Sequence, residues 1–547
     1  MGIEGPLLLI LIVCVASVAR ADVDAAPSDD AEANWSFKRS NFPDGFIFGA
    51  GSSAYQYEGA WNVSGKGTSN WDYFTETYPE MVKNNASGQV AVDFYNLYPG
   101  DFQLMKQVGF DAVRISFSWA RILPSGRESE DPGVNPDGLK YYHNLIDESL
   151  SKGLEPFVTL FHFDIPQALQ DEYGGFLNHR IVKDFHDYAD LCFREFGNKV
   201  KYWITVNEPW SYTSMGFAYG AFPPGRCSKK DKGLESNSGD LFRAGRAFGG
   251  GAANSFSTNC PVKGDSGTEP YIVAHNILLA HARAVQLYKR NYQRSSEGKI
   301  MGQIGIVNVV QWMVPSDAQS KKDIDAANRA LDFMYGWFME PLNSGSYPSS
   351  MIEHVKERLP IFSKAQSEMV KGSFDFIGLN YYTAAYAYDV DCNKIPSYLT
   401  DSCSKLSPIN KSGHQIGPKA ASDWLYIYPK GLGDLLLYTK KNYDNPVIYV
   451  TENGVDLVNQ EHISQDFMRT QYHRDHLRVL SGVMINKLVA VNKVNVKGYF
   501  VWSFLDNFEW SEGYTVRFGL VFVNYVNQTL TRFPKDSAIW FKNRLAQ

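Results

Sequence analysis

Eight short runs of apolar and β-branched residues recur along the chain, each followed by a longer segment with a different periodicity. The runs read GFIFGAGSS, FDAVRISFSW, LEPFVTLFH, KYWITVNE, GQIGIVNVV, FDFIGLNYY, PVIYVTENG and VKGYFVWSF. Continuous apolar runs are typical of parallel strands, because both faces of such a strand are covered. Eight strand-then-helix units predict an α/β fold in which the strands close into a parallel barrel.

The segments between the runs carry apolar residues at three-and-four spacing, which predicts helices over 138–153, 179–197 and 269–292. A doubly wound open sheet is the competing architecture, and it would place a glycine-rich phosphate loop after the first strand. The stretch GAGSSAYQYEGA does not fit that pattern. A length of 547 residues favours several domains, but no linker or internal repeat divides the chain, so we expect one barrel over 41–547.

Polar, acidic and aromatic residues stand at the ends of these runs. The carboxyl ends of barrel strands meet at one rim, where the active sites of such barrels lie. The residues expected at this rim are Gln56, Trp119, His162, Asn207, Glu208, Asn380, Tyr382, Glu452 and Trp502.

Two of these strand ends present a glutamate: YWITVNEPW contains Glu208 and VIYVTENG contains Glu452. Either one alone is more often a solvated rim residue, but the matched pair meets the need of glycoside hydrolysis for two carboxyl groups around a scissile bond. Arg114 could hold one carboxylate ionised while apolar neighbours keep the other protonated. Spacing in the sequence gives no distance between them, so the retaining and inverting outcomes stay open here.

The composition of the chain indicates which classes of ligand it favours. Net charge is −6 without a Lys/Arg-rich run, so the sequence does not favour a nucleic-acid partner. The 12 Trp, 32 Tyr and 34 Phe suit an uncharged ligand with apolar faces, although most of them are expected in the core. No cysteine pair or histidine cluster has metal-ligand spacing, so no metal site is predicted.

The N-terminus has the pattern of a secretory signal. An apolar segment from Pro6 to Val18 precedes Ala19-Arg20-Ala21, although no basic residue precedes it, and it is too short to span a bilayer. We expect a signal peptide over 1–21, a flexible lead-in over 22–40 and no membrane anchor in the mature chain. Passage through the secretory pathway, to the vacuole or the extracellular space, agrees with five glycosylation sequons, at Asn34, Asn62, Asn85, Asn410 and Asn527.

Five cysteines remain once Cys14 leaves with the signal, so at least one is unpaired. Cys192 lies in a helical pattern and is expected to be a buried thiol. Cys227 with Cys260, and Cys392 with Cys403, could each close a loop, although spacing proves neither pairing.

YWITVNEPW and YVTENG resemble the acid/base and nucleophile motifs of glycoside hydrolase family 1, the β-glucosidases, and of its secreted plant members in particular. The resemblance runs from FPDGFIFGAGSSAYQYEGA to GLVFVNYVNQTLTRFPKDSAIWF, about nine-tenths of the chain. It implies a single (β/α)8 TIM barrel with long βα-loop insertions, no cofactor, and a retaining double displacement on a small-molecule β-glycoside. Glu208 would be the general acid/base and Glu452 the nucleophile.

The resemblance also implies a glucose site. Tyr382 would hydrogen-bond the nucleophile, with Asn380 and Arg114 in support. The other residues carried over are Gln56, His162, Asn207, Trp502, Glu509, Trp510 and Phe518. Glu509 would repel a 6-phosphate, which disfavours phosphoglycosides. Phe163 stands where the family commonly has Trp, and the ring then lacks an indole N–H donor.

Rival functions stay open within and outside the family. Thioglucosidases that use ascorbate have Gln at the acid/base position, whereas this chain has Glu208; a second type uses basic residues in the next loop, where this chain has Ala221 and Phe222. These apolar residues favour a hydrophobic aglycone. A transglucosidase would use the same residues, and a non-catalytic glycan-binding barrel would be expected to lose one glutamate. The sequence leaves three properties open: the natural aglycone, the preferred sugar, and whether the chain forms a homo-oligomer.

Overall fold

The computed structural model describes residues 35–228, 260–392, 395–459, 464–485, 493–526 and 529–546. Phe37–Gln547 form one compact unit. This unit begins before the boundary expected at residue 41, because Phe37 is buried against Phe42, Phe48 and Phe541. The expected signal peptide and the sequons at Asn34 and Asn527 lie outside the described residues.

The eight predicted strands form a closed parallel barrel, which confirms the expected (β/α)8 fold. Strand neighbours are hydrogen-bonded in the order β10-β12-β1-β2-β3-β4-β7-β8, and pairing of β10 with β8 closes the ring. A further strand, β9 (Ser404–Ser407), pairs antiparallel with the extended end of β8. The barrel strands are β1 (Ile47–Gly51), β2 (Ala112–Ser116), β3 (Glu155–Phe161), β4 (Tyr202–Asn207), β7 (Gln303–Pro315), β8 (Phe376–Asp389), β10 (Ile448–Asn453) and β12 (Val496–Val501).

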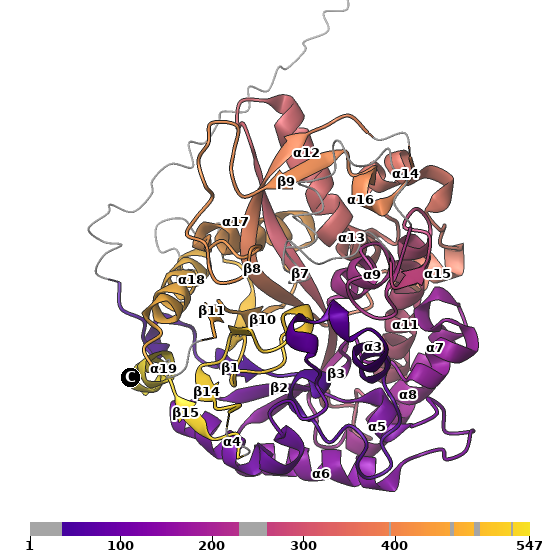
Figure 1. Ribbon diagram of the computed structural model, residues 1–547, viewed down its shortest axis with the longest axis vertical. Helices are drawn as coiled ribbons and strands as arrows, with labels where there is room; N and C mark the ends of the chain where they lie inside the picture. Colours follow the sequence, from indigo (N-terminus) through magenta and orange to yellow (C-terminus); the bar gives the residue numbers. More distant parts are fainter. Residues whose placement is uncertain are drawn as a thin grey trace, which may run out of the picture. The chain divides into compact units, whose positions relative to one another are not determined.

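Helices surround these strands in Figure 1. The longer ones include the three that the sequence predicts, found as α6, α8 and α11. The helices longer than one turn are α3 (Asn70–Thr77), α4 (Phe94–Val108), α6 (Pro136–Ser151), α7 (Gln167–Tyr173), α8 (Ile181–Phe196), α9 (Pro209–Phe217), α11 (Glu269–Asn291), α12 (Lys321–Leu331), α13 (Trp337–Ser344), α14 (Ser349–Val355), α15 (Lys364–Val370), α17 (Pro429–Asn442), α18 (Phe467–Ile485) and α19 (Asp536–Leu545). Single-turn helices are α2 (Ala54–Tyr57), α5 (Trp119–Ile122) and α16 (Tyr398–Asp401).

Short strands outside the barrel pair within a loop or, for β11 with β13, between two loops. These are β5 (Arg226–Cys227) with β6 (Val262–Lys263), β11 (Leu457–Val458) with β13 (Val516–Arg517), and β14 (Val521–Val523) with β15 (Arg532–Pro534). The long βα loops expected from the sequence therefore carry secondary structure of their own.

Local residues determine where helices begin and end. At α6 the Asn135 side chain accepts a hydrogen bond from the Asp137 N–H, and Pro136 occupies the first helical position, where its missing N–H costs nothing. Gly109 ends α4 with φ 96°, a left-handed conformation that glycine adopts without a steric penalty.

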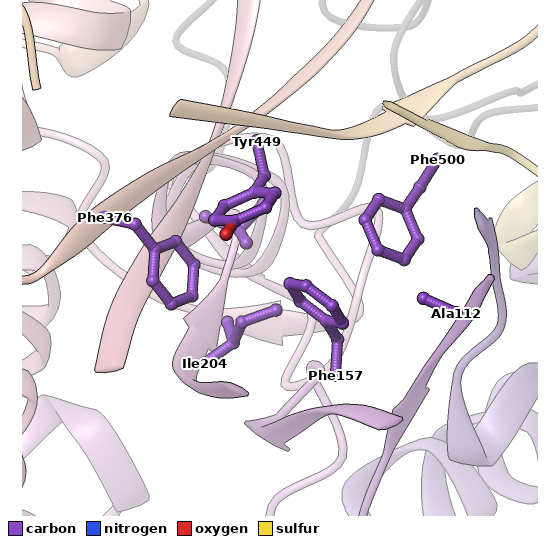
Figure 2. Close-up of a cluster of buried hydrophobic side chains, with 7 residues drawn as sticks. Ala112, Phe157, Ile204, Phe376, Tyr449 and Phe500 are labelled. Atoms are coloured by element: carbon purple, nitrogen blue, oxygen red, sulfur yellow. The ribbon is translucent and has the colours of Figure 1, made fainter. Parts of the chain in front are cut away.

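Large side chains fill the barrel interior. Figure 2 shows a buried cluster to which seven strands each contribute one residue: Ala112, Phe157, Ile204, Val307, Phe376, Tyr449 and Phe500. Ile47 of β1 packs against the same cluster. These residues precede the rim residues of their strands, as Ala112 precedes Arg114 and Phe500 precedes Trp502, so this layer closes the barrel below the polar rim.

Within the described residues, no helix combines the length and the apolar character needed to cross a bilayer.

Candidate active site

Glu208 is set at the junction between β4 and α9. Its backbone has φ 40°, in the left-handed region, and Pro209 opens the helix directly after it. The pairing of β4 with β7 shifts register between Ile204 and Asn207. Irregular pairing and an unusual backbone conformation at a strand end are common where a side chain is redirected into a functional site.

Glu452 lies near the end of β10 and is 4% exposed. The pairing of β10 with β8 also shifts register, between Val450 and Glu452. Both carboxylate oxygens of Glu452 have a strong partner: the Arg114 guanidinium contacts Oε1, and the Tyr382 hydroxyl donates to Oε2 at 2.6 Å. Arg114, from β2, is fully buried, so this ion pair is shielded from solvent.

Among the described residues, both side chains that donate hydrogen bonds to Glu208 are neutral. The Asn380 amide donates to Oε1 at 2.6 Å, and the Ser211 hydroxyl, one turn into α9, donates to Oε2 at 2.7 Å. Glu208 is partly exposed, whereas Asn380 is fully buried.

Asn207 and Asn380 connect the two carboxyl groups. Arg114, which contacts Glu452, also donates to Asn207 Oδ1 at 2.6 Å. The Asn380 amide, which contacts Glu208, donates to the same Asn207 oxygen at 3.2 Å. Side chains from β2, β4, β8 and β10 thus form one hydrogen-bonded group at the carboxyl ends of the strands.

The two glutamates titrate in different surroundings. Burial, and then repulsion from Glu452, raise the pKa of Glu208 to about 7. Burial also raises the pKa of Glu452, while Arg114 and Tyr382 favour its ionised form. Because the positive guanidinium contacts Glu452 directly, we take Glu452 to be the first of the pair to ionise.

A second polar group surrounds Gln56 and Glu509. The Asn507 amide donates to Glu509 Oε1 at 2.8 Å, and Gln56 Nε2 donates to Asn507 Oδ1 at 3.0 Å. Ser53 donates to Gln56 Oε1 at 2.6 Å. Glu509 is 7% exposed, and burial raises its pKa well above the usual range.

Aromatic rings adjoin these polar groups. The Trp502 and Trp510 rings lie at small angles to the His162 ring, with centroids 6.3 Å and 6.0 Å away. Asn207 Nδ2 lies 3.0 Å from His162 Nε2. Phe518 meets the Tyr382 ring edge-on at 5.9 Å. Flat apolar faces next to fixed donors and acceptors suit a polyhydroxylated ring.

Phe163, the departure from the family pattern, is 2% exposed and has φ 74°. Its ring packs 5.2 Å from Trp510. Phe222 is also buried, 3% exposed, and lies 5.7 Å from Trp510. Phe222 therefore supports Trp510 from within the core and does not present the open apolar entrance that the sequence suggests for it.

Most of the expected rim residues come together, but Trp119 does not. Its ring is fully buried, stacks on Tyr188 at 4.6 Å and donates to the Gly126 carbonyl. Ser211 and Asn507 were not among the residues predicted for the site. Ser211 stands three residues after Glu208, and residues at that spacing are neighbours on a helix, so this signal was present.

Both expected disulfides form, Cys227–Cys260 and Cys392–Cys403, and Cys192 is a buried free thiol. His354 Nδ1 lies 3.3 Å from Cys403 Sγ. In the described part of the chain, His354 with these two sulfurs is the single group with the proximity that a metal ion requires. Because both sulfurs are bonded to each other, they are not the thiolates that a metal would need.

A parallel barrel with two linked carboxyl groups at the carboxyl ends of its strands defines a glycosidase-type site. Residues 38–547 match the sequence profile of glycosyl hydrolase family 1. The chain belongs to this family.

The similarity to relatives from plants extends over nearly the whole chain. Beta-glucosidase 24 of Oryza sativa subsp. japonica is 51% identical, over 93% of this chain and 94% of its own length. Raucaffricine-O-beta-D-glucosidase of Rauvolfia serpentina is 50% identical, over 92% and 91%, and oleuropein beta-glucosidase of Olea europaea is 48% identical, over 93% and 90%. A rice β-glucosidase mutant, solved in a covalent complex with glucose, has a TM-score of 0.84 and 41% identity, and the match covers 93% of this chain and 100% of that chain.

Proposed function

We propose that this chain is a retaining β-glucosidase that hydrolyses terminal β-D-glucosyl residues from small-molecule glucosides with a hydrophobic aglycone. The observation that carries the proposal is the asymmetry of the two carboxyl groups. Glu452 is held by a guanidinium and a phenol, which favour its anion, whereas Glu208 accepts from the neutral Asn380 and Ser211, and burial raises its pKa to about 7. One group is thus suited to attack and the other to give a proton at mildly acidic pH.

In the first step, protonated Glu208 gives its proton to the glycosidic oxygen while a Glu452 oxygen attacks the anomeric carbon. The bond from that carbon to the glycosidic oxygen breaks, and the aglycone leaves as an alcohol. The sugar is then bonded to Glu452 through an ester, and Glu208 is ionised.

In the second step, Glu208 acts as a base. It takes a proton from water, the water oxygen attacks the anomeric carbon, and the ester to Glu452 breaks. The product is glucose with its original β configuration. Glu208 is protonated and Glu452 is ionised again, as at the start. The covalent complex with glucose of the rice β-glucosidase supports this route.

Two observations support the substrate class. Relatives at about 50% identity are named for raucaffricine and oleuropein, and both names are those of β-glucosidases. In this chain Trp424, partly buried, meets the Tyr382 ring edge-on at 5.7 Å and so adds an aromatic ring beside Tyr382, the partner of Glu452.

The test compares the wild type with Glu208→Gln and Glu452→Gln on an activated aryl β-glucoside and an unactivated alkyl β-glucoside. Glu208→Gln should retain the first step only on the aryl substrate, and added azide should restore turnover and yield a β-glucosyl azide. Glu452→Gln should be inactive on both substrates. Proton NMR should show β-glucose as the first product.

A first product with the α configuration would overturn the retaining mechanism. Turnover of neither glucoside by the wild type would overturn the β-glucosidase proposal and favour a glycan-binding barrel. Preference for an S-linked aryl glucoside over its O-linked equivalent would favour a thioglucosidase, and glucose transfer to an added alcohol in preference to water would favour a transglucosidase.

A further inference from the structure

The hydrogen bonds around Glu208 have a direction that starts at Arg114. A guanidinium only donates, so Asn207 Oδ1, 2.6 Å from Arg114 Nη2, must be the acceptor. The Asn207 amide nitrogen then faces His162 Nε2 at 3.0 Å and donates to it. Burial and the positive charge of Arg114 lower the pKa of His162 well below its usual value, which agrees with a neutral ring that accepts at Nε2.

The same direction continues to Glu208. Because Asn207 Oδ1 is an acceptor, the Asn380 group 3.2 Å from it must be the amide nitrogen. That nitrogen also lies 2.6 Å from Glu208 Oε1. The remaining Asn380 oxygen accepts from the Thr451 hydroxyl at 2.8 Å. Glu208 Oε1 therefore faces an N–H donor in every protonation state of the site.

The other oxygen, Oε2, has a partner of a different kind. Ser211 Oγ lies 2.7 Å from Oε2, and Ser211 is buried, 6% exposed, in the first turn of α9. A hydroxyl rotates, so it can donate to a carboxylate and can equally accept from a protonated carboxyl group. An amide nitrogen can only donate.

We propose that Oε2 is the oxygen of Glu208 that gains and loses the proton, and that Ser211 is a positioning residue whose rotating hydroxyl is the partner of Oε2 in both states. This inference rests on the proposed acid/base role of Glu208. In the resting enzyme the Oε2–H group donates to Ser211. When the proton passes from Oε2 to the glycosidic oxygen, Ser211 turns and donates to the new carboxylate.

The Ser211 hydrogen bond therefore strengthens as negative charge develops on Glu208, which is a contribution to the transition state. Other titratable and charged groups around Glu208 are Glu452 on β10, Arg114 on β2 and Tyr382 on β8, while His162, after β3, contacts the neighbouring Asn207. A substitution at Ser211 changes none of them, so its effect on the pH profile reports Ser211 itself.

The experiment measures kcat/KM against pH for an unactivated alkyl β-glucoside, whose first step needs the proton of Glu208, with Ser211→Ala, Ser211→Thr and Ser214→Ala. Loss of the donor to the carboxylate should move the basic limb of Ser211→Ala upward by about one pH unit. Ser211→Thr keeps a hydroxyl and should restore the wild-type limb. Ser214 lies on the same helix, and its hydroxyl bonds the Trp210 carbonyl, so Ser214→Ala should leave the limb in place.

An unchanged or lower basic limb in folded Ser211→Ala would overturn the proposal, with folding judged from an unchanged Tm. If that variant does not fold, Ser211→Cys replaces it, and its weak S–H donor should move the limb upward by a smaller amount. Glu208→Gln separates the two proposals. If it still turns over the alkyl glucoside with the wild-type basic limb, the acid/base role fails. If that turnover is lost while Ser211→Ala does not move the limb, only the Ser211 proposal fails.

Discussion

Glu208 and Glu452 carry the same carboxyl group, and their neighbours make the two groups differ in acidity. Arg114 and Tyr382 contact Glu452, whereas Asn380 and Ser211 contact Glu208. A charged donor stabilises a carboxylate more than a neutral donor does. At the residue scale, these four contacts are the basis of the roles proposed for the two glutamates.

Tyr382→Phe should lower kcat roughly tenfold to a hundredfold, because Glu452, the proposed nucleophile, loses a buried donor. The phenol favours the ionised form of Glu452, so its loss should raise the pKa of Glu452 and move the acid limb of kcat/KM to higher pH. The measurement is a pH profile on an aryl β-glucoside. Tyr188→Phe is the matched control, since the buried Tyr188 hydroxyl donates to the Leu160 carbonyl away from the glutamates. An acid limb that does not move would contradict the role of Tyr382.

Glu208→Gln should stabilise the fold at pH 8 and have little effect at pH 4. The folded-state pKa of Glu208 is about 7, above the ordinary value of about 4.3, so the folded protein binds more protons between these values. The free energy of unfolding therefore falls as pH rises from about 4.3 to about 7, by about 1–3 kcal/mol. A neutral glutamine does not titrate and avoids this decrease.

Thermal unfolding at pH 4 and pH 8 measures this effect. Glu353→Gln on α14 is the control, because Glu353 is exposed and its replacement should leave the difference between the two pH values unchanged. A Glu208→Gln variant less stable than the wild type at pH 8 would contradict the prediction.

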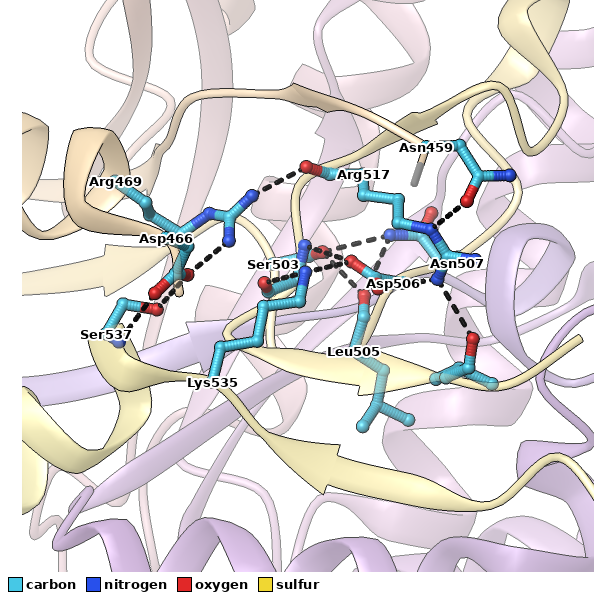
Figure 3. A network of polar contacts seen from close by, with 12 residues as sticks. Asn459, Asp466, Arg469, Ser503, Leu505, Asp506, Asn507, Arg517, Lys535 and Ser537 are labelled. Carbon is cyan, nitrogen blue, oxygen red and sulfur yellow. Dashed lines mark hydrogen bonds and ion pairs between the residues drawn. The ribbon is translucent and has the colours of Figure 1, made fainter. Parts of the chain in front are cut away.

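At the element scale, the loop after β12 depends on the C-terminal segment. Figure 3 shows Asp506 between Lys535, directly before α19, and Arg517 of β13. Asp506 Oδ1 lies 2.7 Å from Lys535 Nζ, and Oδ2 lies 2.7 Å from Arg517 Nη1. All three side chains are buried. The next residue, Asn507, holds Glu509, so this ion-pair network supports the second polar group of the site.

Asp506→Asn should lower the free energy of unfolding by about 3–5 kcal/mol, because two buried cations then lose their counter-charge. The KM for an aryl β-glucoside should rise, since the loop that carries Glu509 loses its anchor. Urea denaturation and steady-state kinetics measure the two effects. Asp434→Asn is the control, since Asp434 pairs with the largely exposed Lys430 and should cost less than about 0.5 kcal/mol. An equal cost for both variants would contradict the importance of the buried network.

The helices and strands were more predictable from the sequence than the register shifts that orient side chains at the strand ends. All eight apolar runs are strands of the barrel, and the three predicted helices are α6, α8 and α11. The register shifts at the ends of β4 and β10 were not predicted, because a shift depends on the partner strand. Trp119 illustrates the same limit: it follows a strand, yet it packs on Tyr188 of a helix outside the barrel.

At the scale of the whole molecule, we propose that the chain enters the secretory pathway, as its N-terminal segment and two disulfides suggest. In a glycosylating host the mature protein should begin near Asp22. Asn62 and Asn85 are exposed and should carry glycans. N-terminal sequencing and the mass shift on endoglycosidase treatment of Asn62→Gln and Asn85→Gln variants measure this. An intact Met1 or an absent shift would contradict secretion.

The sequence by itself determined the barrel, the two glutamates and most residues around them, because strand periodicity and motif position are local properties of a chain. Only the tertiary structure decided which residue contacts which glutamate. Arg114 and Glu452 are far apart in sequence, and Asn380 reaches Glu208 from another strand. Hydrogen-bond direction, burial and acidity arise from these long-range contacts, so the different environments of Glu208 and Glu452 became visible only after the barrel had brought its strand ends together.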